Sequence, residues 1–61
     1  MANLTTKELA ALEDQLGFEK MLCCKYNQAA NTSTEAELKH RYSNLAAQHQ
    51  QNFRTLLGFL N

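Results

Sequence analysis

The chain lacks proline and tryptophan, and it has only two glycines and two cysteines among its 61 residues. Without proline, and with alanine, leucine, glutamine, glutamate and lysine abundant, the composition favours helix throughout. Cys23 and Cys24 are adjacent, so they provide no disulfide framework to staple a small fold. A single core in a chain of this length rarely supplies more than about 3–5 kcal/mol. We therefore expect a partner chain to complete the core.

Net charge is also lacking, because six Lys and Arg residues balance six Asp and Glu residues. This balance argues against a nucleic acid or another polyanion as partner, and we interpret the short basic run at Lys39, His40 and Arg41 as a solvated helix face. No apolar run is long enough to span a membrane, and the polar start at residues 1–8 does not resemble a signal peptide. Together with the free thiols, these features predict a cytoplasmic location.

Apolar side chains recur at steps of three and four from Leu9 to Ala30, which predicts a helix over about residues 6–30. Thr5 and Glu8 have the spacing of a capping box at its start. Gly17 falls beside the apolar stripe and costs about 1 kcal/mol relative to alanine in a helix interior.

The only credible break is Asn31-Thr32-Ser33, because Asn tolerates the left-handed conformation that ends many helices. We expect a loop over about residues 31–34, a second capping box at Thr34 and Glu37, and a second helix over about residues 35–59. A loop this short makes the helices antiparallel. The sequence therefore predicts an all-α fold, with residues 1–61 forming one helical hairpin domain.

A titratable side chain interrupts the inward stripe of each predicted helix near its middle. Glu19 stands in the first stripe and His49 in the second, and an antiparallel hairpin brings them to similar heights. The other inward positions are Leu9, Leu12, Leu16, Cys23, Tyr26 and Ala30 in the first helix, and Leu38, Tyr42, Leu45, Ala46, Phe53, Leu56, Leu57 and Leu60 in the second. We interpret the segment from Gln48 to Asn52, apart from His49, as solvated.

Three roles are open for Glu19 and His49. A buried carboxylate needs a partner, so a hydrogen-bonded pair that fixes register is the favoured interpretation. Two copies of the chain would bring together two carboxylates and two imidazoles, a sensible ligand set for zinc or iron, so Glu19 and His49 are the candidate metal ligands. Catalysis is the weakest alternative, and no other cofactor is indicated.

Both helices carry more apolar surface than one seam between them can bury. Phe18, Met21 and Leu22 widen the first stripe, and Phe53, Leu57 and Phe59 widen the second. Two hairpins packed face to face would close this surface as a four-helix bundle, so we expect a homodimer. The alternatives are a tetramer, another helical chain as partner, or an adaptor that presents an open groove to a peptide.

Two further pairs of residues admit a functional interpretation. Cys23 and Cys24 could form a redox or cross-linking site, although we favour Cys23 as a small core residue and Cys24 as its neighbour near the surface. Tyr26 and Tyr42 lie at inward positions near the loop, where core packing is the simplest role.

Two segments of the chain resemble the Coat F family of bacterial spore coat proteins. Leu12-Glu13-Asp14-Gln15-Leu16-Gly17-Phe18-Glu19-Lys20, followed by Lys25-Tyr26, is similar to the first helix of these domains. Leu45-Ala46-Ala47-Gln48-His49-Gln50-Gln51, followed by Leu56-Leu57, is similar to the next helix.

The resemblance covers nearly the whole chain and implies a ferritin-like four-helix bundle, a sporulating bacterium and a coat-associated role, with other coat proteins as candidate partners. Ferritin-like di-iron half-sites pair a glutamate on one helix with Glu-x-x-His on the next. Glu19 and His49 match that pattern, but Ala46 replaces the second glutamate, which argues against oxidase or iron-storage activity. We therefore predict a structural protein without enzymatic activity.

Overall fold

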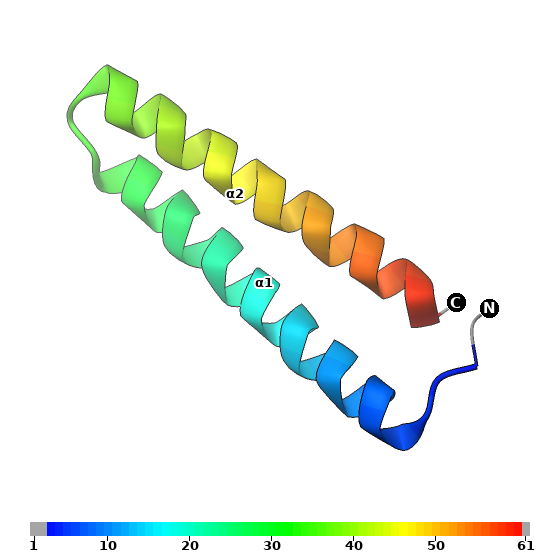
Figure 1. Ribbon diagram of the computed structural model, residues 1–61. Helices are drawn as coiled ribbons and strands as arrows, with labels where there is room; N and C mark the ends of the chain where they lie inside the picture. The colour runs from blue at the N-terminus through cyan, green and yellow to red at the C-terminus, as the bar shows by residue number, and fades with distance from the viewer. Residues whose placement is uncertain (1–2, 61) are drawn as a thin grey trace.

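The computed structural model describes residues 3–60, and the regular secondary structure in this range is all helical. Helix α1 spans Thr6–Thr32, helix α2 spans Ala36–Leu57, and a short 3-10 helix, η1, spans Gly58–Leu60. Helices α1 and α2 run side by side in opposite directions, joined by a tight connection (Figure 1). The predicted all-α antiparallel hairpin is confirmed.

Helix α1 begins with the capping box that the sequence predicts. The backbone N–H of Glu8 donates to the Thr5 hydroxyl at 3.1 Å, and the Glu8 carboxylate accepts from the Thr5 backbone N–H at 3.0 Å. Thr5 has extended backbone angles, as an N-cap residue should. The Thr5 backbone N–H, with a smaller contribution from the Thr5 hydroxyl, holds the pKa of Glu8 below its ordinary value, because both groups favour the ionised carboxylate.

The connection between the helices differs from the one that the sequence predicts. Helix α1 continues through Asn31 to Thr32, whose hydroxyl donates to the carbonyls of Gln28 and Ala29 at 3.1 and 3.3 Å. Ser33 then caps the helix in an extended conformation, with its backbone N–H and its hydroxyl both donating to Ala29. A left-handed residue at Asn31 was the wrong expectation, since no residue in the described range has positive φ.

The predicted second capping box is also wrong. The N-cap of α2 is Glu35, one residue later than expected, and it makes no side-chain capping bond. Glu37 therefore occupies the second helical position, whereas the box requires a glutamate at the third. Its carboxylate instead pairs with Arg41 one turn later, at 3.3 Å on the exposed surface. At the other end α2 stops at Leu57, and η1 occupies the last turn expected for this helix.

The hairpin is a single layer of helices and buries little apolar surface. Its principal extents are 46 × 16 × 11 Å, and its radius of gyration of 14.3 Å exceeds the roughly 10–11 Å of a compact domain of this length. Neither long helix within residues 3–60 has the length and apolar character required to cross a membrane. In the described range the buried residues are Leu16, Glu19, Ala30 and Ala46.

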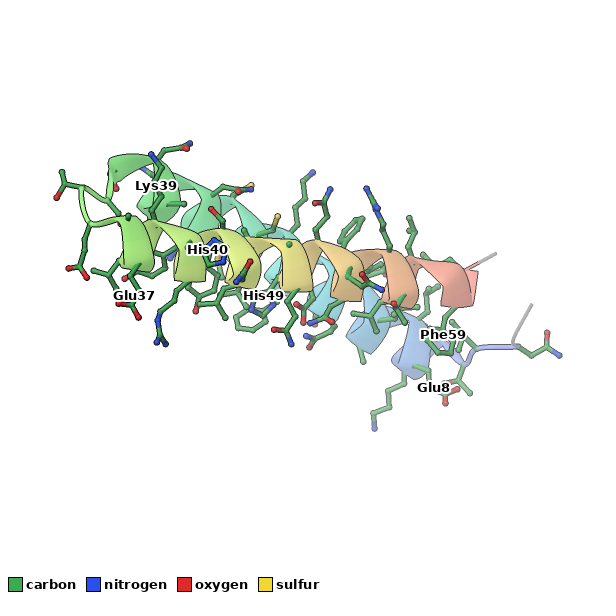
Figure 2. The ribbon with its side chains drawn as sticks, turned by 90° about the horizontal axis from the view of Figure 1, so that it is seen from above. Glu8, Glu37, Lys39, His40, His49 and Phe59 are labelled. Carbon is green, nitrogen blue, oxygen red and sulfur yellow. The ribbon has the colours of Figure 1, made fainter. Side chains whose placement is uncertain are left out.

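Several predicted core residues are exposed in the single hairpin, because two helices share only one seam and wider stripes flank it. Phe18 and Phe59 are 51% and 52% exposed, and Phe59 lies with Glu8 at the end opposite the loop (Figure 2). The sequence placed five further residues at inward positions, but in the single hairpin they are exposed: Leu9, Leu38, Leu45, Leu57 and Leu60. The predicted excess of apolar surface is thereby confirmed.

Candidate functional site: a carboxylate shared by both helices

Glu19 and His49 meet at the middle of the hairpin, as their places in the two stripes predict. Glu19 extends from α1 and is 7% exposed, and it is the one charged residue that is buried in the described range. His49 extends from α2 near mid-length, well away from the basic residues at the loop end (Figure 2). Its ring atom Nδ1 lies 2.5 Å from Oε1 of Glu19.

Two amides complete the set of contacts around this carboxylate. Nε2 of Gln15, one turn before Glu19 on α1, donates to Oε2 at 2.8 Å. Nδ2 of Asn52, one turn after His49 on α2, donates to Oε1 at 3.3 Å. We call these four side chains (Gln15, Glu19, His49 and Asn52) the Glu19 cluster. Both carboxylate oxygens thus accept hydrogen bonds, and donors come from both helices.

The hydrogen bonds decide the charge of Glu19. The contact with His49 is the largest influence and lowers the pKa of the carboxyl, burial opposes it, and the Gln15 and Asn52 amides lower it further. The net effect places the pKa below its ordinary value, so Glu19 is ionised at neutral pH. An ionised carboxylate can only accept, so the proton in the short contact belongs to Nδ1 of His49.

Aromatic rings fix the orientation of the imidazole. The Tyr26 ring stacks on the His49 ring at 5.6 Å between centroids, with an interplanar angle of 11°. The Tyr26 ring also stacks on the Tyr42 ring, with 6.1 Å between the centroids and an interplanar angle of 22°. Tyr26 and Tyr42 are half-buried, as their predicted inward positions require. The stack therefore holds the imidazole plane in place while Glu19 holds its Nδ1 proton.

One copy of the cluster offers few free ligands to a metal ion. The Glu19 oxygens already accept hydrogen bonds, which leaves Nε2 of His49 as the nitrogen through which the cluster could bind a cation. Structural zinc sites use four protein ligands, and catalytic sites use three with a water. Within residues 3–60 no group of three or more His, Cys, Asp or Glu side chains is placed to hold an ion. A metal site at Glu19 and His49 would therefore need residues from a second copy.

The two cysteines lie on the opposite flank of the seam from the amides of the Glu19 cluster. Cys23 is half-buried and its Sγ accepts from Nδ2 of Asn27 at 3.7 Å, while Cys24 is exposed. Both line an open pocket of about 300 Å³ with Lys20, Gln50 and Phe53. A second open pocket, of about 390 Å³, lies beside the Glu19 cluster and is lined by Gln15, Glu19, Asn52, Thr55 and Leu56.

The sequence interpretation missed two members of the Glu19 cluster. Asn52 was assigned to a solvated face, but it is half-buried and bonded to Glu19. Gln15 was given no role. A usable signal existed in the helical spacing, because Gln15 lies four residues before Glu19 and Asn52 three residues after His49. Amides at those steps from a buried ion are natural donors.

Comparison of the chain with protein families, with curated proteins and with solved structures finds no match. The function is therefore inferred from the geometry of the chain.

Proposed function

We propose that this chain is a non-enzymatic structural protein that acts as a homodimer, in which two hairpins form a ferritin-like four-helix bundle. The exposed apolar surface supports this proposal most directly. Within residues 3–60, eight large hydrophobic side chains are at least 36% exposed, and the shortest dimension of the hairpin is 11 Å. Domains usually bury such side chains between two packed layers, and a second hairpin supplies the missing layer.

The Glu19 cluster supports a structural role over a catalytic one. Its carboxylate accepts hydrogen bonds from three donors, and its histidine is held by a ring stack, so both helices are fixed at one register. Glu19 already accepts three hydrogen bonds, which makes it a poor general base or nucleophile. Buried polar groups that fix register are well known in coiled coils.

The resemblance to Coat F domains supports assembly in the spore coat as the setting for this dimer. Coat proteins associate through surfaces, and a small bundle with no net charge suits that role. A tagged copy expressed in a sporulating bacterium should be recovered with the coat layers of purified spores. Recovery only from the mother-cell cytoplasm would contradict the coat assignment and leave the dimer proposal standing.

Measurement of mass in solution tests the dimer itself. Sedimentation equilibrium over a range from micromolar to millimolar should give the dimeric mass, and the melting temperature should rise with concentration because folding and association are coupled. A helical monomer throughout that range would contradict the proposal and favour the open-groove adaptor. A mass above that of a dimer would favour the tetramer.

The second candidate is a metal-binding bundle, which the carboxylate–imidazole geometry favours. Histidines that bind metals usually donate their other ring proton to a carboxylate, as His49 does to Glu19. Purification without chelator followed by metal analysis should then find zinc or iron near one ion per dimer, and His49→Ala should abolish it. A metal content that is unchanged in His49→Ala would exclude this site.

A further inference from the structure

One flank of α1 carries a second stripe, distinct from the stripe that packs on α2. Its members recur at steps of three and four, so they share one side of the helix. Gln15, which lines the pocket beside the Glu19 cluster, lies between the two stripes and shows that this flank adjoins the cluster. We call the stripe the Phe18 face, and it consists of Ala11, Asp14, Phe18, Leu22, Lys25 and Ala29.

The Phe18 face is the more apolar side of α1 outside the seam. Phe18 is 51% exposed and Leu22 is half-buried, although both would pack well in a core. The other flank carries the exposed polar residues Glu13, Lys20 and Asn27 at steps of seven, and its exposed apolar side chains, Leu9 and Cys24, are smaller than Phe18. A partner that removes apolar surface from water therefore gains more on the Phe18 face than on the other flank.

The Phe18 face is self-complementary when two copies of α1 lie antiparallel. Asp14 and Lys25 lie on either side of a midpoint between residues 19 and 20, and Phe18 and Leu22 lie on either side of residue 20. Ala11 and Ala29 are also centred on residue 20. If two α1 helices pack antiparallel about this midpoint, Asp14 of each copy faces Lys25 of the other. Phe18 meets Leu22, and the small alanines meet near the ends.

We infer that the Phe18 face is the surface on which a second copy of this chain docks, with the two α1 helices antiparallel. The inference rests on the proposed dimer and specifies its interface. A two-fold interface requires that if residue i contacts residue j, then j also contacts i, and the paired residues on this face satisfy that condition. Two Asp14–Lys25 ion pairs per dimer complement the apolar contacts.

In the alternative arrangement the two-fold axis runs along the bundle, so each residue has the same height in both copies. The Phe18 face then packs against α2 of the second copy. The Tyr26–Tyr42 stack places those two residues at one height, so Arg41 of the second copy would lie close to Lys25. Like charges at such an interface oppose association. Charge complementarity therefore favours pairing of α1 with α1.

Charge reversal tests the inferred interface. At low salt, Asp14→Lys and Lys25→Asp should each weaken dimerisation about 10- to 30-fold, because each converts two attractions per dimer into two repulsions. The double variant Asp14→Lys/Lys25→Asp should restore the dissociation constant to within about threefold of the wild type. High salt should reduce all of these differences.

Matched controls lie on the other flank of α1. Glu13→Lys and Lys20→Asp make the same changes of charge on the same helix, and dimerisation should change less than about threefold. Sedimentation velocity or a fluorescence dilution assay measures all five variants.

The outcomes separate the interface from the dimer. A wild-type chain that is monomeric throughout would overturn the proposed function and this inference together. A dimer that is insensitive to Asp14→Lys and Lys25→Asp, or equally sensitive to the controls, would overturn the Phe18 face alone. Tighter association of Lys25→Asp would show that Lys25 faces Arg41, which is the alternative arrangement.

Discussion

The substitution Phe18→Ala should weaken association strongly if the chain is a dimer, and it should have little effect if the chain is a lone hairpin. A phenylalanine can bury about 150–250 Å², and Phe18 is 51% exposed in the hairpin, so about 100 Å² remains for a partner to cover. At about 25 cal/mol per Å², complete burial contributes about 2.5 kcal/mol per copy, or about 5 kcal/mol per dimer. This value is an upper limit, and it corresponds to a dissociation constant raised by about 3.5 orders of magnitude.

In a lone hairpin the same substitution should have a small effect. Alanine is a better helix former than phenylalanine by about 0.5 kcal/mol, which partly offsets the loss of the half of the ring that is buried against the hairpin. Sedimentation equilibrium of Phe18→Ala and wild type measures the difference directly. Leu57→Ala is the control. Leu57 is 40% exposed, and it lies one turn after Phe53, which lines the cysteine pocket on the opposite side of the seam from Phe18. Equal dissociation constants for wild type and Phe18→Ala would refute the reasoning.

Three further perturbations test the hairpin and its buried carboxylate. Gly17→Ala should stabilise the chain by about 1 kcal/mol, because Gly17 lies inside α1 with no atom within 4 Å of the added methyl group, and thermal denaturation should show a rise of about 4–8 °C. Leu16→Ala should cost about 2–5 kcal/mol, since Leu16 is the one large apolar residue that is buried in the described range. Circular dichroism should show most of the helix lost if no partner compensates. Glu19→Gln should flatten the acid limb of a plot of stability against pH. The lowered pKa of Glu19 stabilises the folded chain above about pH 4.3, the ordinary pKa of glutamate. This stabilisation is lost as the pH falls through the lower pKa of the folded state. An unchanged acid limb would show that the carboxylate has the same pKa in the folded and unfolded chain.

The helices and the central pair could be predicted from sequence because local signals determine them. The capping box at Thr5 and Glu8 and the periodic stripes act within a few residues, and Glu19 and His49 interrupt those stripes at matching heights. The connection was harder, because Thr32 and Ser33 bond back to carbonyls of α1 and extend it by half a turn. That extension moved the N-cap of α2 to Glu35 and removed the expected box at Thr34.

Asn52 shows why composition was a poor guide to the site. It follows a run of glutamines and looks like part of a solvated face, yet it bonds to a carboxylate on the other helix. Exposure of Leu45 and Phe59 has a similar origin, because a stripe predicts which side of a helix is apolar but not how many neighbours cover it. Only the distances between α1 and α2 reveal which side chains the seam reaches.

The ring stack gives the molecule a built-in optical probe. With no tryptophan in the chain, near-ultraviolet emission comes from Tyr26 and Tyr42, and these two phenols face each other across α1 and α2. Their emission and near-ultraviolet dichroism therefore follow the opening of the hairpin beside its loop. Phe18 absorbs and emits only weakly by comparison. Tyrosine signals should thus follow closure of each hairpin, and hydrodynamic measurements should follow association, so the two events can be timed separately in one sample without a label.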